Sequence, residues 1–124
     1  MPVKTERVAV LGASKKPDRY SNKAVLLLKE HGHNVVPVHP VEKQIEGLNV
    51  APSLREIGGS VDTLTVYVGP HHIAPLIDEI VALRPGRVIL NPGTESSQLE
   101  SALTENGIPY LEACTLVLLK TGQF

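Results

Sequence analysis

The sequence is poor in cysteine and in aromatic residues: it has one cysteine, no tryptophan, one phenylalanine and an aromatic fraction of 3%. A single cysteine excludes a disulfide within the chain and favours a reducing compartment. The scarcity of aromatic rings argues against a stacking platform for single-stranded nucleic acid. The formal net charge of -1 argues against the broadly basic surface of a nucleic-acid-binding protein.

Long apolar runs are also missing. No stretch of about 18 apolar residues occurs, so the sequence predicts neither a transmembrane helix nor a membrane partner. Residues 1–4 lead into a polar stretch without the apolar centre of a signal peptide, and we expect a cytoplasmic protein. The 124 residues, of which 42% are hydrophobic, predict one domain spanning residues 1–124. A separate catalytic half does not fit in this length, so we do not expect an enzyme.

What the chain does contain is a regular alternation of apolar runs and amphipathic stretches. Short apolar runs predict strands at Arg7–Leu11, Asn34–Val38, residues 63–68, Arg87–Leu90 and residues 109–111. Capping residues and helical periodicity predict helices at residues 21–31, 53–57, 71–83 and 96–106. Residues 115–119 fit either a strand or a helical turn, and residues 39–54 are expected to form an extended connection.

This alternation predicts βαβ units and therefore an α/β fold. We expect a doubly wound, Rossmann-like parallel sheet of about five strands, in three αβα layers with right-handed crossovers. Ligands of such sheets bind outside the carboxyl ends of the strands. Small residues and prolines, which let a ligand approach the backbone, are concentrated at these ends. They occur at residues 12–14, 40, 69–70 and 92–93.

The loop after the first strand carries the strongest indication of a ligand. Gly12 ends the strand, a helix follows, and Lys15, Lys16, Arg19 and Lys23 surround the helix start. Free N–H groups at a helix N-terminus favour an anion, so the pattern predicts a phosphate site. The alternative is an ordinary turn with solvated basic residues. The loop does not have the spacing of a Walker A motif.

The same loop is a poor dinucleotide-binding fingerprint. Ser14 and Pro17 occupy positions where that motif requires glycine. An NAD site also needs an acidic residue at the end of the second strand, where this chain has Val38, His39 and Pro40. His39 could contact an adenine or ribose edge, or it could be a solvent-facing loop residue.

Several short segments, taken together in their order and spacing, resemble a known family. They are residues 8–14, 18–23, 31–32, 36–40, 45–47, 51–54 and 61–62, together with Cys114 near the end. In these segments the chain is similar to the small single-domain proteins of the CoA-binding domain family. It also resembles the N-terminal domain of the succinyl-CoA synthetase α subunit.

The resemblance implies a Rossmann-like domain that binds coenzyme A, or acyl-CoA, across the carboxyl ends of the strands. By position it assigns three groups of ligand-contacting residues. The phosphates are met by Gly12, Ala13, Ser14 and Lys15, with support from Arg19, Ser21 and Lys23. The adenine is bordered by Val38, His39, Pro40, Val68, Gly69, Pro70 and Ile73, and the pantetheine by Asn91, Pro92 and Gly93.

The remaining chemistry-bearing residues predict neither catalysis nor a metal site. His71 and His72 are adjacent and cannot easily face one metal ion, and no paired acid and base specifies a reaction. Cys114 is expected to be a structural thiol, the alternative being a mixed disulfide with the thiol of coenzyme A.

Three functional hypotheses remain. The first is noncatalytic binding of coenzyme A or acyl-CoA as a small-molecule nucleotide ligand. The second is a redox module that binds NAD(P). The third is the CoA-binding subunit of a multi-chain acyl-CoA ligase, which would require a protein partner of unknown identity.

Overall fold

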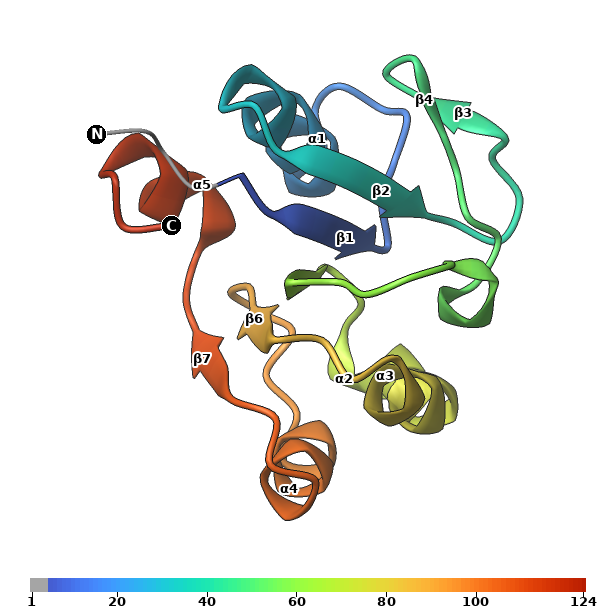
Figure 1. Cartoon of the computed structure of the whole chain (residues 1–124), viewed down its shortest axis with the longest axis vertical. Coiled ribbons are helices and arrows are strands. Elements are labelled where there is room, and N and C mark those ends of the chain that lie inside the picture. The colour runs from blue at the N-terminus through green and yellow to red at the C-terminus, as the bar shows by residue number, and fades with distance from the viewer. Residues whose placement is uncertain (1–4) are drawn as a thin grey trace.

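The computed structural model describes residues 5–124 as a five-stranded sheet with helices on both faces (Figure 1). Residues 1–4, on which the expectation of no signal peptide rested, lie outside this range. The strands of the sheet are β1 (Arg7–Leu11), β2 (Asn34–Val38), β5 (Thr63–Val66), β6 (Arg87–Leu90) and β7 (Tyr110–Glu112). They are all parallel in the order β2-β1-β5-β6-β7, which confirms the predicted fold class.

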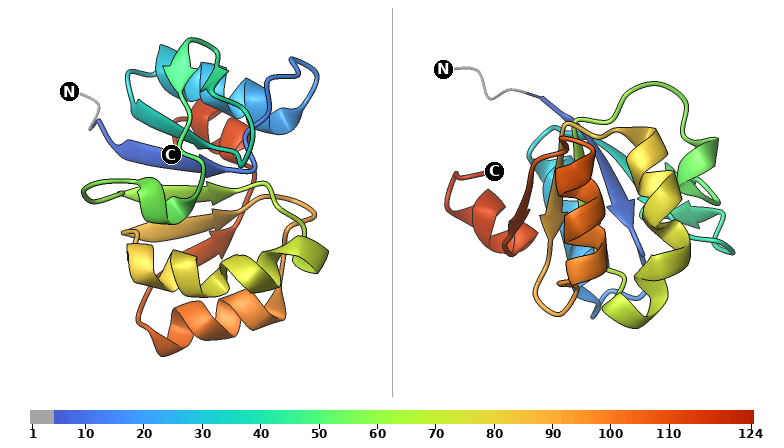
Figure 2. Two further views of the ribbon diagram at one scale, coloured as in Figure 1. Left: turned by 90° about the vertical axis from the view of Figure 1, so that its right-hand side faces the viewer. Right: turned by 90° about the horizontal axis from the view of Figure 1, so that it is seen from below.

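The helices form one layer on each face of the sheet (Figure 2). Helices α1 (Tyr20–Glu30) and α5 (Thr115–Lys120) cover one face. The other face is covered by α2 (Pro70–Ile73), α3 (Ile77–Leu83), α4 (Ser97–Glu105) and the short 3₁₀ turns η1 (Leu54–Glu56) and η2 (Ala74–Leu76). No helix within residues 5–124 has the length and apolar character to cross a bilayer.

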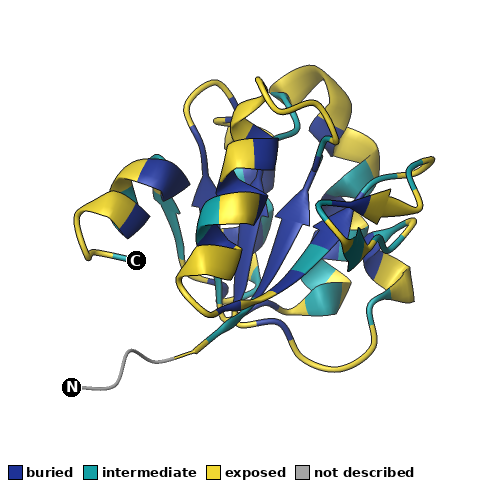
Figure 3. Cartoon of the chain, turned by 90° about the horizontal axis from the view of Figure 1, so that it is seen from above, coloured by how far each residue is buried: buried dark blue, intermediate teal, exposed yellow. Residues whose placement is uncertain are grey.

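Strand β1 shows why the sheet strands are almost uninterrupted apolar runs. Val8 and Val10 pack in the core beneath α1 and α5, whereas Ala9 and Leu11 pack in the core beneath α2, α3 and α4. Strands that lie between two helix layers need apolar side chains on both faces. They therefore lack the alternation of apolar and polar residues that is typical of a strand with one face in solvent. The central strands are accordingly buried along their length (Figure 3).

The segment predicted as one helix over residues 71–83 is divided into α2, η2 and α3. Pro75 lies in the 3₁₀ turn between the two α-helices. Proline has no N–H to donate and its ring crowds the preceding turn, which disrupts the regular hydrogen bonding of an α-helix. The prediction of a single helix was therefore wrong at this residue, although the buried face runs on through Ile73, Ile77 and Ile80.

Two other segments were settled by the structure. Residues 39–54, expected to be an extended connection, contain a hairpin of β3 (Gln44–Ile45) and β4 (Leu48–Asn49). Its two turn residues, Glu46 and Gly47, have φ of 51° and 78°. Two-residue hairpin turns of this kind require positive φ at both positions. Residues 115–119, which fitted either a strand or a helical turn, belong to α5.

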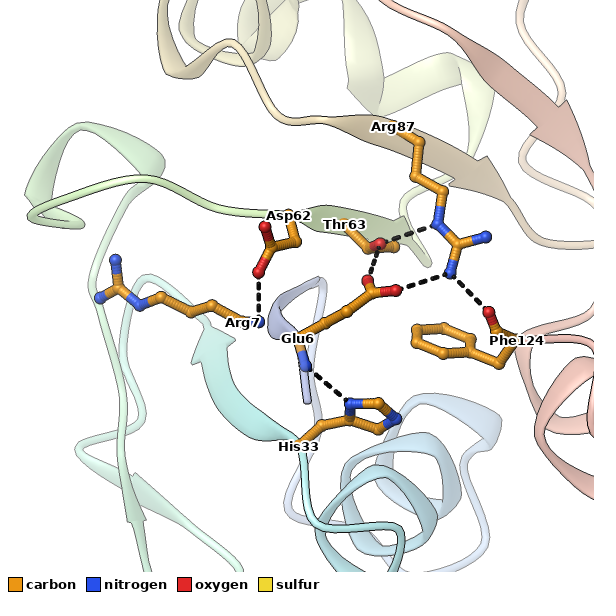
Figure 4. Close-up of polar contacts among 7 residues, drawn as sticks. All are labelled: Glu6, Arg7, His33, Asp62, Thr63, Arg87 and Phe124. Carbon is orange, nitrogen blue, oxygen red and sulfur yellow. Dashed lines mark hydrogen bonds and ion pairs between the residues drawn. The ribbon is translucent and has the colours of Figure 1, made fainter. Parts of the chain in front are cut away.

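A polar cluster ties the amino ends of the strands to the C-terminal segment (Figure 4). Arg87 Nε donates to Thr63 Oγ1 at 2.8 Å, and Arg87 Nη2 lies 3.5 Å from Glu6 Oε2. Arg87 also donates to the Phe124 carbonyl oxygen at 3.2 Å and lies 4.6 Å from the centre of the Phe124 ring. This cluster lies at the sheet edge opposite the carboxyl ends of the strands. Its polar and charged groups make their hydrogen bonds and ion pairs mainly with one another.

His33, beside this cluster, should make stability depend on pH. Its Nδ1 accepts the Glu6 N–H at 3.1 Å, and burial lowers the pKa of His33 below 6.5, with the Glu6 carboxylate opposing the shift. Below about pH 6.5 the unfolded chain therefore binds a proton that the folded chain does not. The free energy of unfolding should fall as the pH drops from about 6.5 through the folded-state pKa.

Urea unfolding at a series of pH values measures this dependence. The variant His33→Gln should lose part of this fall in the free energy of unfolding, whereas His71→Gln, which changes an exposed histidine of α2 that does not act on the pKa of His33, should keep it. An equal pH dependence in the wild type and His33→Gln would show that His33 does not contribute.

Candidate functional site

The carboxyl ends of the strands meet at one edge of the sheet. Leu11 in β1 lies opposite Val38 in β2 and Val66 in β5, and Val66 lies opposite Leu90 in β6. The chain leaves β1 toward β2 on one side and leaves β5 toward β6 on the other. Ligands of open α/β sheets bind at such a reversal of strand order.

A cavity of about 630 Å³ opens at this edge. Ligand cavities in proteins commonly have volumes of about 300–1,000 Å³, so its size is that of a ligand site. The cavity is lined by Gly12, Ala13, Ser14, Lys16, Arg19, Tyr20, Ser21, His39, Tyr67, Gly69, Pro92, Gly93 and Thr94.

Gly12 lets the first loop pass close to the neighbouring strand. Its φ is +84°, and an added Cβ would lie 3.0 Å from Val68 Cγ2 and 3.3 Å from the Tyr67 carbonyl carbon. A side chain at Gly12 would therefore meet both backbone strain and steric crowding. The N–H groups of Gly12 and Ala13 donate to the Val38 carbonyl oxygen, which fixes the loop against β2.

Side chains beneath the first loop hold it in shape. Ser14 Oγ accepts the Lys16 N–H at 3.1 Å. Asn22, fully buried in α1, donates from Nδ2 to the Ser14 carbonyl oxygen and to Glu46 Oε2, both at 2.9 Å. Asn22 thus connects the first loop to the β3–β4 hairpin. It was not among the residues predicted for the site, because its partner Glu46 is remote in sequence.

The N-terminus of α1 faces the cavity with positive electrostatic potential. Arg19 is its N-cap residue in an extended conformation, no side chain accepts a capping hydrogen bond there, and no acidic residue occurs in the first turn. The unpaired N–H groups of a helix start carry partial positive charge. Lys16 and Arg19 line the same part of the cavity, so this end of it is suited to an anion.

Five residues expected to contact the ligand line neither this cavity nor the second cavity described below. Lys15 Nζ lies 3.4 Å from Glu42 Oε2, and the Lys15 side chain is 67% exposed. Lys23 Nζ lies 5.6 Å from the centre of the Tyr20 ring. The others are Pro70 at the start of α2, Ile73 in the hydrophobic core, and Asn91.

Asn91 holds the end of β6 in place instead. It is 2% exposed, and its Nδ2 donates to Thr65 Oγ1 at 2.7 Å and to the Val66 carbonyl oxygen at 2.8 Å. Its Oδ1 accepts the Thr115 N–H at 2.9 Å. Asn91 therefore joins β5, β6 and the start of α5 below the cavity, while the following residues, Pro92 and Gly93, line it.

His39 and Tyr67 supply hydrogen-bonding groups in the cavity lining. His39 Nδ1 accepts the N–H groups of Val41 and Glu42 at 3.1 and 2.9 Å, so the proton of the neutral ring is on Nε2. Burial raises the pKa of Tyr67 to about 12, an effect partly opposed by the hydroxyl groups of Thr115 and Thr65. Tyr67 is therefore protonated at neutral pH and is a hydrogen-bond donor.

Tyr20, Tyr67 and Thr94 line the cavity but were not among the predicted ligand contacts, and Lys16, which belongs to the basic cluster predicted to favour a phosphate, was not assigned a contact by the resemblance. Their proximity to strand ends was visible in the sequence, but the direction of each side chain was not. Within residues 5–124, no group of three or more His, Cys, Asp or Glu side chains is arranged to hold a metal ion.

A second, mostly apolar cavity of about 290 Å³ shares Gly12 with the first. It lies between the end of β1, the segment before η1 and the helices α2 and α3. Its lining residues are Leu11, Gly12, Val38, Pro40, Pro52, Ser53, Leu54, Val68, His72, Pro75, Leu76 and Glu79. Val38, Pro40 and Val68, assigned to the adenine by resemblance, lie here rather than in the larger cavity.

Comparisons with known proteins agree with this fold. Residues 6–120 match the family model described as "CoA binding domain". The structure of cell-free ID.343 from Thermus thermophilus is 34% identical, with a TM-score of 0.89, over 97% of this chain and 91% of that one.

Two further relatives are more distant. The uncharacterized protein YneT of Bacillus subtilis (strain 168) is 28% identical over 78 residues, which are 63% of this chain and 58% of YneT. The dinucleotide forming acetyl-coenzyme A synthetase 1 of Ca. Korarchaeum cryptofilum shares the fold. It has a TM-score of 0.76 and 20% identity over 87% of this chain and 25% of that one.

Proposed function

The chain belongs to the CoA-binding domain family, and we propose that it binds coenzyme A or acyl-CoA across the carboxyl ends of the strands. The phosphates would lie at the first loop and the N-terminus of α1, near Lys16 and Arg19. The adenine would enter the apolar cavity beyond Gly12, and the pantetheine would pass Pro92 and Gly93.

The observation that carries this proposal is the pair of cavities that meet at Gly12. One has basic side chains and free helix N–H groups, and the other has apolar walls. A ligand that fills both combines anionic groups with a less polar part, and coenzyme A, with its phosphates and its adenine ring, has this composition. The end of β2 supports coenzyme A over NAD, because His39 follows Val38 where an acidic residue would bind the ribose of NAD.

Binding without catalysis is part of the proposal. None of the residues that line the larger cavity is a carboxylate. His39 is the lining residue best suited to be a general base, but its Nδ1 already accepts two backbone N–H groups. A larger cavity that offers the phosphates and the pantetheine no free carboxylate or imidazole base is suited to holding the ligand.

Coenzyme A should therefore stabilise the chain against heat. At a ligand concentration one hundred times Kd the gain is about 2.7 kcal/mol, which raises Tm by roughly 10 °C for a domain of this size. Thermal unfolding with coenzyme A, acetyl-CoA, NAD and NADP measures it. Stabilisation by NAD or NADP without stabilisation by coenzyme A would overturn the proposal in favour of a redox module.

A further inference from the structure

The first loop is held from below by one buried amide group. Asn22 is fully buried, and its Nδ2 donates two hydrogen bonds of 2.9 Å, one to the Ser14 carbonyl oxygen and one to Glu46 Oε2. An amide nitrogen has two hydrogen atoms, so both are used. Because two acceptors face this nitrogen, the amide has one favourable orientation, and the bond to the carboxylate is the stronger kind of hydrogen bond.

Further hydrogen bonds connect Ser14 to the basic residues of the larger cavity. The Ser14 hydroxyl oxygen accepts the Lys16 N–H at 3.1 Å, and the Lys16 carbonyl oxygen accepts the Arg19 N–H at 3.1 Å. Ser14, Lys16 and Arg19 all line the larger cavity, whereas Asn22 lines neither this cavity nor the apolar one. An effect of Asn22 on a ligand in the larger cavity would therefore pass through the first loop.

Glu46 is itself held firmly. It lies in the turn of the β3–β4 hairpin, and its carbonyl oxygen accepts a hydrogen bond of 2.8 Å from Lys29 Nζ of α1. The adjacent Ile45 is 1% exposed and packs in the core beneath α1 and α5. The turn is thus attached to α1 through Asn22 and Lys29 and to the core through Ile45. The Glu46 carboxylate is therefore a fixed partner for Asn22.

We propose that Glu46, acting through Asn22, is a positioning residue for the first loop. This inference rests on the proposed function, because it concerns the loop at which the phosphates of coenzyme A would lie. A loop that already has its bound conformation loses less conformational entropy when the ligand binds, so binding is tighter. Without Glu46, the Asn22 side chain is freer to move, and the loop from Ser14 to Arg19 is less well ordered before the ligand arrives.

The negative charge of Glu46 separates this role from simple electrostatics. A carboxylate near an anion site repels the ligand, so the loss of its charge alone should tighten binding. If Glu46 positions the loop, Glu46→Ala should instead weaken binding of coenzyme A about fivefold. Glu46→Gln keeps an oxygen that can accept from Asn22 and lacks the charge, so it should bind coenzyme A at least as tightly as the wild type.

Isothermal titration calorimetry of the full chain with coenzyme A measures these changes, and Glu42→Ala is the matched control. Glu42 lies on the same connection between β2 and β5 and contacts the first loop through the exposed Lys15. Its replacement removes the same charge but not the hydrogen bond to Asn22, so binding should be unchanged or slightly tighter. Urea unfolding verifies that each variant is folded.

A double-mutant cycle tests whether Glu46 acts through Asn22. Asn22→Ala should weaken binding more than Glu46→Ala, because the hydrogen bond to the Ser14 carbonyl oxygen is lost as well. In a chain that already carries Asn22→Ala, the change Glu46→Ala should cause no further weakening. If Asn22→Ala does not fold, the comparison of Glu46→Ala with Glu46→Gln and Glu42→Ala decides.

The outcomes separate this inference from the proposed function. The inference is overturned, and coenzyme A binding stands, if Glu46→Ala does not weaken binding, if Glu46→Gln weakens it equally, or if the loss persists without Asn22. If coenzyme A does not bind, but inorganic pyrophosphate binds in an NMR titration with the same pattern among the variants, the positioning role stands and the proposed function fails. If neither binds, both are overturned.

Discussion

Replacing Asn91 by leucine should lower the free energy of unfolding by about 3–5 kcal/mol. Leucine has a similar size but makes none of the hydrogen bonds that Asn91 makes to Thr65, Val66 and Thr115. The Thr115 N–H and the Val66 carbonyl oxygen would then be buried without these partners, and each such group costs about 1–3 kcal/mol. Chemical denaturation followed by circular dichroism measures the loss.

Asn49→Leu is the matched control. Asn49 is exposed on β4, and its side chain makes only a marginal contact of 3.5 Å with Gln44. This change should alter stability by no more than about 0.5 kcal/mol. If Asn91→Leu cost no more than this control, Asn91 would not be the structural residue inferred from its contacts.

The outcome bears on the role of Asn91 in the site. The resemblance places it beside the pantetheine, whereas in the structure its Nδ2 already donates to Thr65 and Val66 and its Oδ1 already accepts from Thr115. We therefore expect Asn91→Leu to weaken ligand binding through displacement of Pro92 and Gly93, and not through a lost contact with the ligand.

Reversing the charge of Lys16 and Arg19 together should weaken binding of coenzyme A by about a hundredfold. Each charge-assisted hydrogen bond to a phosphate is worth about 1.5–3 kcal/mol, but both residues are exposed and solvent screens part of this energy. A hundredfold loss corresponds to about 2.7 kcal/mol. Calorimetric titration of the Lys16→Glu, Arg19→Glu variant measures it, and thermal unfolding without ligand should be almost unchanged.

The double variant Lys15→Glu, Lys23→Glu has the same change in net charge and is the appropriate control. Neither residue lines the larger cavity or the apolar cavity, and Lys15 is paired with Glu42. Only long-range repulsion should act on the ligand, so the loss should be less than tenfold at physiological salt. Equal losses in the two double variants would mean that the binding energy comes from the overall charge of the loop and not from the residues that face the cavity.

The sequence alone was sufficient for the fold class and for the edge of the sheet where the candidate site lies. Strands such as Arg7–Leu11 are buried on both faces, so they appear as nearly unbroken apolar runs. In the helices between them, apolar residues recur with helical spacing. Both patterns are local in the sequence, so they can be recognised without knowing the tertiary contacts. The position of Gly12 was equally predictable, because a glycine between a strand and a basic helix start is typical of a loop that approaches an anion.

Only the tertiary structure decided which side chains face the cavities. Lys15 and Lys16 are adjacent in sequence, yet one pairs with Glu42 and the other lines the larger cavity. The hydrogen bonds of Asn91 depend on Thr65 and Thr115, which are remote from it in the chain. The physical reason is that periodicity records which residues are buried, whereas the direction and the partners of a polar side chain are set by non-local packing.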